Sequence, residues 1–186
     1  GFGSLSTDEF TDVTLTGTST FTSGSIIGGT GSNLFVTGTL DYFGTAIDIS
    51  LNNAGTVNVG DSQTLELEHD GTHSGVFNLD IMATPTFTDG THNFETGASV
   101  TGGDSTMTIQ AAGNSLILNF NAAVTFEPRF LFFDGTVAGA GDLTAGGGFL
   151  WGGGALAGTG KLILPAATPV TVSPLFGDLY WAGRTL

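Results

Sequence analysis

Short runs in which apolar and polar residues alternate follow one another along the whole chain. The clearest run is 13–22, where every second residue from 14 onward is threonine and Leu15 and Phe21 face the opposite way. A period of two predicts strands, and further strands are expected at 34–36, 46–51, 64–68, 115–120 and 161–164. Gly, Asn and Asp residues separate these runs and predict tight turns between them.

A tetrapeptide recurs along the chain. The sequence Asp-Gly-Thr-His at 70–73 returns at 89–92, and Asp-Gly-Thr appears again at 134–136. A glycine-rich frame that starts at Gly135 is repeated from Gly154, at the same spacing. Periods of roughly 20 residues predict stacked units that bury their apolar faces against one another. We therefore expect an all-β fold, a parallel β-solenoid with about 19 residues in each rung and three short strands per rung.

The whole chain, 1–186, is expected to form one domain, because no linker divides it. Pro165, Pro169 and Pro174 remove backbone donors, which places the segment 161–172 at a strand edge, a corner or an irregularity. The apolar residues expected inside the solenoid are Leu65, Leu67, Phe77, Phe87, Val100, Leu116, Leu118, Leu143, Phe149, Leu156 and Leu162.

Composition excludes several classes of function. Three basic residues against 17 acidic ones give a net charge of −14, which would repel nucleic acid and anionic membranes. No apolar run approaches the roughly 20 residues that span a bilayer. The absence of cysteine excludes disulfides and thiol chemistry. The chain starts at Gly1 without a charged and apolar leader, so we expect that any export signal has been removed or was never part of this sequence.

Several segments resemble a repeat of very large bacterial surface proteins of the filamentous-haemagglutinin-like and autotransporter-passenger-like type. The resemblance is carried by 64–77, 87–92, 97–102, 148–160 and 183–186, with 51–57 similar to the start of such a repeat. It implies a right-handed parallel β-helix at the cell surface or outside the cell, with structural or adhesive roles and no catalytic residues. Residues 51–186 would then be one repeat module and 1–50 the preceding rungs.

Two motifs have a possible metal chemistry. His73 and His92 stand at the same place in consecutive copies beside Asp70 and Asp89, and imidazole with carboxylate can ligate zinc or copper. The alternative is a repeated tight turn whose Asp and Thr bond their own backbone. The segment 28–36 matches a calcium-binding nonapeptide of β-rolls with Asn33 in the place of Asp, so a calcium site and a plain turn both stay open.

Other patterns suggest alternatives. The glycines of 152–157 fit a dinucleotide fingerprint, but no strand-helix-strand pattern surrounds them. Asp and Glu on neighbouring rungs could provide the acid and base of a polysaccharide-degrading enzyme. Glu66 and Glu68, however, fall on one strand face and, with Asp70, fit solvent-facing charge. The threonine run 14–22 could bind ice, or could form a hydrogen-bonded ladder.

We expect a non-catalytic structural module, a spacer or scaffold of an extracellular bacterial surface or fibre protein, without a cofactor. Its expected partners are neighbouring repeats or copies of itself, stacked end to end, because segment 180–186 ends the chain with two aromatic residues and no charged run. The alternatives are an adhesin that binds a surface glycan or host surface, a polysaccharide-degrading enzyme and an ice-binding protein.

Overall fold

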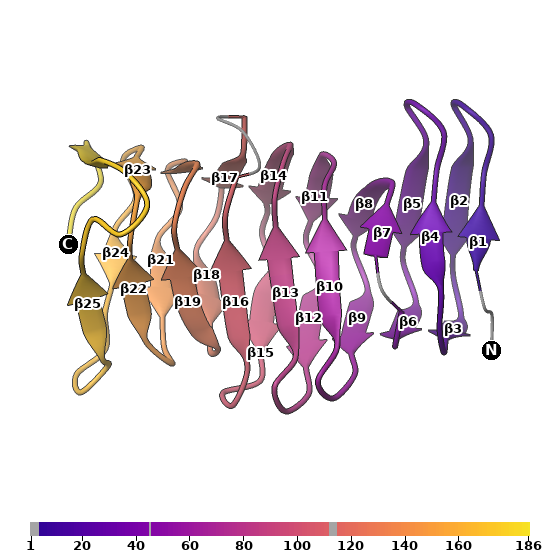
Figure 1. Ribbon diagram of the computed structural model, residues 1–186, viewed down its shortest axis with the longest axis horizontal. Coiled ribbons are helices and arrows are strands. Elements are labelled where there is room, and N and C mark those ends of the chain that lie inside the picture. Colours follow the sequence, from indigo (N-terminus) through magenta and orange to yellow (C-terminus); the bar gives the residue numbers. More distant parts are fainter. Residues whose placement is uncertain (1–3, 45, 112–114) are drawn as a thin grey trace.

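A computed structural model describes residues 4–44, 46–111 and 115–186. In these ranges the chain is all-β without a helix, and it winds into a parallel β-solenoid of about 8 rungs with about 21 residues in each. Figure 1 shows the rungs side by side in one row, with the indigo N-terminus and the yellow C-terminus at opposite ends. No helix in the described ranges has the length and apolarity needed to cross a bilayer.

Each rung contributes one strand to each of three parallel sheets. Sheet 1 contains β1 (Leu5–Ser6), β4 (Ser25–Ile27), β7 (Ala46–Asp48), β10 (Thr64–Leu67), β13 (Thr84–Phe87), β16 (Thr106–Ile109), β19 (Arg129–Phe132), β22 (Phe149–Trp151) and β25 (Val170–Val172). Sheet 2 contains β2 (Asp12–Leu15), β5 (Asn33–Val36), β8 (Ser50–Asn53), β11 (Gly71–His73), β14 (Thr91–Phe94), β17 (Ile117–Phe120), β20 (Thr136–Ala138), β23 (Gly154–Ala157) and β26 (Leu179–Ala182). Sheet 3 contains β3 (Thr18–Phe21), β6 (Thr39–Tyr42), β9 (Thr56–Val59), β12 (Val76–Leu79), β15 (Ser99–Thr101), β18 (Val124–Phe126), β21 (Leu143–Ala145) and β24 (Leu162–Ile163).

The length of a rung varies along the chain. Thr136 pairs with Ala155, at the spacing that the sequence predicts. Thr39, however, pairs with Thr56, which is closer in sequence, and Thr91 pairs with Ile117, which is farther away. The expectation of one uniform period therefore holds for the pairs between residues 117 and 163 and is wrong elsewhere in the described chain. Strand pairing fixes which residues of successive rungs stack on one another. The corners between strands vary in length without changing this stacking.

Corners also divide two of the predicted strands. The run 13–22 bends after β2, so that Thr14 lies on sheet 2 and Thr18 and Thr20 on sheet 3. The expectation of a single threonine face over 14–22 is wrong for this reason. The predicted strand 46–51 is likewise divided into β7 and β8, with Ile49 buried at the corner.

Glycine recurs where the chain passes from sheet 2 to sheet 3, because successive rungs approach one another very closely there. A Cβ on Gly38 would overlap the carbonyl oxygen of Gly17, one on Gly55 that of Gly38, and one on Gly75 that of Gly55. This column explains part of the high glycine content of the chain.

The interior is one continuous apolar core. Every residue predicted to lie inside is buried. Like side chains stack along the axis, as expected: the rings of Phe94 and Phe120 have centroids 5.1 Å apart, and those of Phe130 and Phe149 5.8 Å apart. Burying one such side chain contributes about 1.5–3 kcal/mol to stability. The prolines lie where predicted, with Pro165 and Pro169 in the corner before β25.

Candidate functional sites

The two Asp-Gly-Thr-His copies lie on neighbouring rungs but are out of register by two residues. Gly71 pairs with His92, and His73 pairs with Phe94. The expectation that equivalent residues stack directly on one another is corrected by this pairing. A shift of two residues keeps every side chain on its own face of the sheet. It also pairs His92 with Gly71, whose missing side chain leaves room for the His73 ring, since a Cβ there would meet His73 Cε1 at 2.8 Å.

The three Asp-Gly-Thr copies adopt two local structures. The Asp89 carboxylate accepts a hydrogen bond from the Gly90 amide at 2.7 Å, and Asp134 accepts one from Gly135 at the same distance. Both glycines have positive φ, at 80° and 93°. Asp70 instead accepts a hydrogen bond from the Thr91 amide of the next rung, at 2.6 Å. The predicted tight turn therefore describes the second and third copies, while Gly71 begins a strand.

His73 and His92 form a buried, hydrogen-bonded pair. His92 Nε2 lies 3.1 Å from the carbonyl oxygen of Asp89 and must carry a proton to donate to it. Nδ1 of the neutral His92 ring is then an acceptor, and His73 Nε2 donates to it at 3.2 Å. This assignment leaves His73 Nδ1 as a buried acceptor with no hydrogen-bond partner in the described structure.

Aromatic rings surround the pair. The Phe87 centroid lies 4.6 Å from that of His92, and the Phe77 and Phe94 centroids both lie 5.1 Å from that of His73. Burial lowers the pKa of His92 to about 4. Burial, and then repulsion from His92, lower the pKa of His73 well below its ordinary value. Both rings are therefore neutral at physiological pH.

The predicted metal ligands are only partly brought together. Among the described residues, no group of three or more His, Cys, Asp or Glu side chains lies close enough to hold a metal ion. Asp70 and Asp89 are engaged with backbone amides, so the site of four residues stays a prediction. In the calcium-like segment, the Asn33 amide donates to the Asp12 carboxylate at 2.8 Å and links two rungs.

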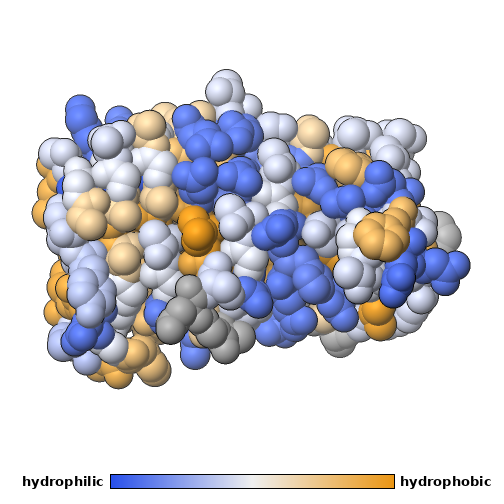
Figure 2. Space-filling view, turned by 90° about the horizontal axis from the view of Figure 1, so that it is seen from above, coloured by the Kyte–Doolittle hydropathy of each residue, from blue (hydrophilic) through white to orange (hydrophobic). Residues whose placement is uncertain are grey.

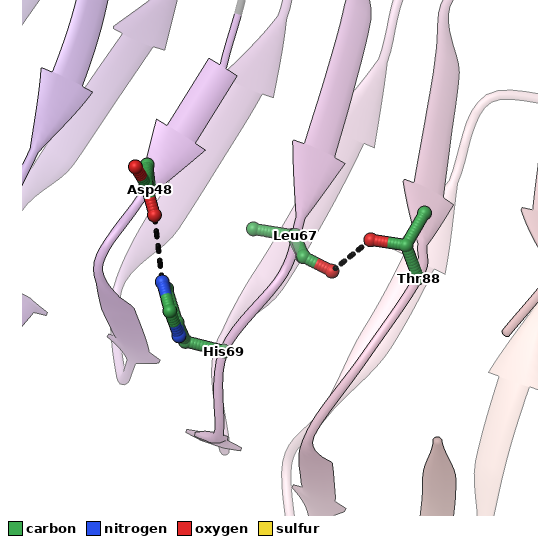
Figure 3. Close-up of polar contacts among 4 residues, drawn as sticks. All are labelled: Asp48, Leu67, His69 and Thr88. Carbon is green, nitrogen blue, oxygen red and sulfur yellow. Dashed lines mark hydrogen bonds and ion pairs between the residues drawn. The ribbon is translucent and has the colours of Figure 1, made fainter. Parts of the chain in front are cut away.

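An exposed polar cluster lies on the corner between sheets 1 and 2. His69 Nε2 contacts Asp48 Oδ1 of the preceding rung at 2.6 Å, with the two side chains 49% and 46% exposed. Figure 3 shows this contact beside a second one between rungs, in which the Thr88 hydroxyl donates to the Leu67 carbonyl at 3.3 Å. Exposed ion pairs contribute about 0–1 kcal/mol. In Figure 2, which views this corner from above, hydrophilic side chains gather over the middle of the molecule.

A ladder of polar side chains runs along the outer face of sheet 3. The Thr20 hydroxyl and the Asn58 amide both donate to Asp41, at 3.5 Å and 2.7 Å. The Asn78 amide donates to Asn58 at 3.2 Å, and the Thr101 hydroxyl donates to Asn78 at 3.1 Å. These side chains are hydrogen-bonded to one another across five rungs. They form a ladder of the kind expected for the threonine run 14–22, but only Thr20 comes from that run.

The C-terminal end exposes apolar side chains. Val170, Val172 and Trp181 pair with buried residues of the preceding rung and so point inward, yet all three are exposed, Trp181 by 43%. Leu186 is also exposed. At the other end, inward-facing Leu5 and Val13 are half-buried.

Arg184 closes one corner of the C-terminal end. Its guanidinium is buried and donates to the carbonyl oxygens of Ala138, Gly141, Ala157 and Lys161 at 2.9–3.3 Å. Burial lowers its pKa, and the negative charge of Asp142 opposes this change. The sequence contains only three basic residues, and that scarcity was the one signal that could have drawn attention to Arg184.

The fold defines the class of protein to which the chain belongs, the parallel β-solenoid repeat proteins. Comparison with family models, with curated proteins and with solved structures finds no match to this chain.

Proposed function

We propose that this chain is a non-catalytic structural module, a spacer or scaffold of an extracellular bacterial surface or fibre protein, that associates end to end with neighbouring repeats or copies of itself. The observation that carries the proposal is the open last rung, where inward-facing Val170, Val172 and Trp181 remain exposed. Strand edges of this kind accept a further strand through main-chain hydrogen bonds. The extracellular setting rests on the resemblance of segments such as 64–77 to surface-protein repeats.

Charge favours axial over lateral association. The net charge of −14 is carried on a solenoid with acidic side chains along its corners, so two molecules lying side by side repel each other. The last rung presents apolar side chains and main-chain groups instead, and β26 carries no charged residue. Salt shortens the range of the repulsion to about 10 Å at 0.1 M, so added salt should strengthen axial stacking.

Sedimentation velocity over a range of protein and salt concentrations tests the proposal. The unchanged chain should form longer species as either concentration rises. Val172→Lys puts a charge on the apolar end and should abolish them, whereas Thr171→Lys, on the outward face of the same strand, should leave them in place. A strictly monomeric chain at high protein and salt concentration would refute end-to-end association, as would assembly that Val172→Lys does not affect.

A further inference from the structure

The last corner between sheets 1 and 2 is longer than the equivalent corner of the preceding rung. Two residues, 152–153, separate β22 from β23, whereas six residues, 173–178, separate β25 from β26. The rung from Gly154 to its partner Leu179 is accordingly longer than the rung from Thr136 to its partner Ala155. Added corner residues leave the stacked columns intact, so the loop 173–178 is free to carry side chains over the outer surface.

This loop forms the wall of a surface hollow of about 380 Å³. The floor lies on the outer face of sheet 2, where Thr136, Ala155 and Tyr180 occupy one column. The first two side chains are small and the third is large, so the floor lies below the tyrosine ring. The residues that line the hollow are Asp134, Gly135, Thr136, Gly154, Ala155, Phe176, Gly177, Asp178 and Tyr180.

Two aromatic rings at the hollow are exposed but held in place. Phe176 and Tyr180 are 59% and 58% exposed. The Phe176 ring packs edge-on against Phe133, with centroids 4.7 Å apart, and the Tyr180 hydroxyl donates to Asp178 at 3.1 Å. Held aromatic rings provide contact area at low entropic cost when a ligand binds.

We propose that this hollow binds a neutral carbohydrate. A sugar ring combines an apolar face of C–H groups, which packs on an aromatic ring, with hydroxyl donors for carboxylates such as Asp134 and Asp178. Pockets for small ligands join apolar surface to a few polar groups in this way, at volumes of roughly 300–1,000 Å³.

Charge selects a neutral sugar over an acidic one. The residues that line the hollow include two aspartates and no Lys, Arg or His, so a uronate, sulfate or phosphate group would meet like charge. The Asp134 carboxylate is held by the Gly135 amide at 2.7 Å, which fixes its direction at the rim. The hollow opens on a side face, so sugar binding does not depend on the proposed axial association.

Nuclear magnetic resonance titration of the isotopically labelled chain tests this inference. The probes are maltose, cellobiose, lactose and diacetylchitobiose as neutral disaccharides, with glucuronate as the acidic comparison. At least one neutral disaccharide should give saturable shifts of the Gly135, Gly154 and Gly177 amides, and glucuronate should bind more weakly. Tyr180→Ala should weaken binding by about tenfold or more, because it removes the stacking ring. Phe10→Ala removes an exposed ring at the other end of the molecule and should change nothing.

Two further variants separate the contribution of the Tyr180 ring to sugar binding from those of its hydroxyl group and of the Asp178 carboxylate. Tyr180→Phe retains the ring without the hydroxyl and should bind within about threefold of the unchanged chain. Asp178→Asn should weaken binding, whereas Asp61→Asn, at another exposed corner, should not. The inference is refuted if none of the neutral disaccharides gives saturable shifts, if the shifts persist in Tyr180→Ala, or if glucuronate binds equally well. Val172→Lys should retain sugar binding, which separates this test from that of end-to-end association.

Discussion

Acid should destabilise the middle of the solenoid, where His73 and His92 are buried as neutral rings. The pKa of His92 is lowered to about 4 from its ordinary value of 6.5. Between these two pH values the unfolded chain binds a proton that the folded chain does not. The free energy of unfolding therefore decreases as the pH falls, by about 3 kcal/mol for His92 alone. His73, whose pKa is lowered further, acts in the same direction.

The contribution of this pair must be separated from that of nearby charges. Asp70, Asp89 and His69 lie near it, and their charges also act on His92. The double variant His73→Leu, His92→Leu removes both buried imidazoles and keeps an apolar interior. It should lose less stability on acidification than the unchanged chain, while His69→Gln, which alters only an exposed ring, should follow the unchanged chain.

Denaturant unfolding from about pH 7.5 down to about pH 4.5 measures the difference. We expect the double variant to retain at least the roughly 3 kcal/mol that the unchanged chain loses through His92 alone, with a further gain from the absence of His73. Hydrogen exchange in acid should be fastest at β11 and β14 among the central strands, because these two strands carry the pair. Equal acid sensitivity of the two proteins would refute the argument, and so would early opening of a region far from β11.

Three further changes test the packing. Arg184→Met removes the donors of four carbonyl groups and should lower stability by about 2–3 kcal/mol in denaturant unfolding. Gly75→Ala should cost about 1–3 kcal/mol, because its Cβ would overlap the Gly55 carbonyl, whereas Gly103→Ala, with no neighbour within 4 Å, should be nearly neutral in thermal melts. Asn58→Asp replaces a donor to Asp41 by a like charge and should destabilise the chain by about 1–2 kcal/mol at pH 7, with recovery below about pH 4 if the ladder argument holds.

Residue alternation was sufficient to predict the strands and the core, while the spacing of the repeats predicted the solenoid. In strands such as β9 and β10 every second residue is apolar, and the inward residues are the buried ones. This follows from the geometry of a strand, which sends successive side chains to opposite faces. The prolines of 165–174 were placed correctly for an equally local reason, the missing backbone donor.

The pairing register of neighbouring rungs could not be predicted from the repeated Asp-Gly-Thr-His motif. The copies at 70–73 and 89–92 are identical in sequence, yet Gly71 begins a strand and Gly90 forms a tight turn with φ of 80°. The choice depends on how the His92 ring fits against Gly71 and His73 on the rung before. Such a fit between rungs has no signature in a single rung, so the spacing of the repeated letters fell two positions short of the pairing distance.

The sites were harder to predict for the same reason. The outer ladder joins Asp41, Asn58 and Asn78, which are separated by 17 and 20 residues and share no fixed period. The surface hollow depends on the loop 173–178, which is longer than the corresponding corner 152–153 of the preceding rung. Sequence periodicity identifies the strands and inward residues that all rungs share. The polar ladder and the hollow depend on residues that are particular to single rungs.

The location of the hollow follows from how a solenoid can accept change. An inward residue is constrained by its neighbours on all sides, and even the space beside Gly71 is taken, by the Leu51 carbonyl of the preceding rung and the His73 ring. An outward column is constrained less, but its groups tend to bond one another, as Asn58 and Asn78 do, and so have fewer free positions for a ligand. A lengthened corner carries neither constraint. Its added residues can project over a flat face and turn it into a concave one, as Phe176 and Asp178 do beside sheet 2. In this chain the corner after β25 is therefore a place where binding chemistry can be added at little cost to the stack.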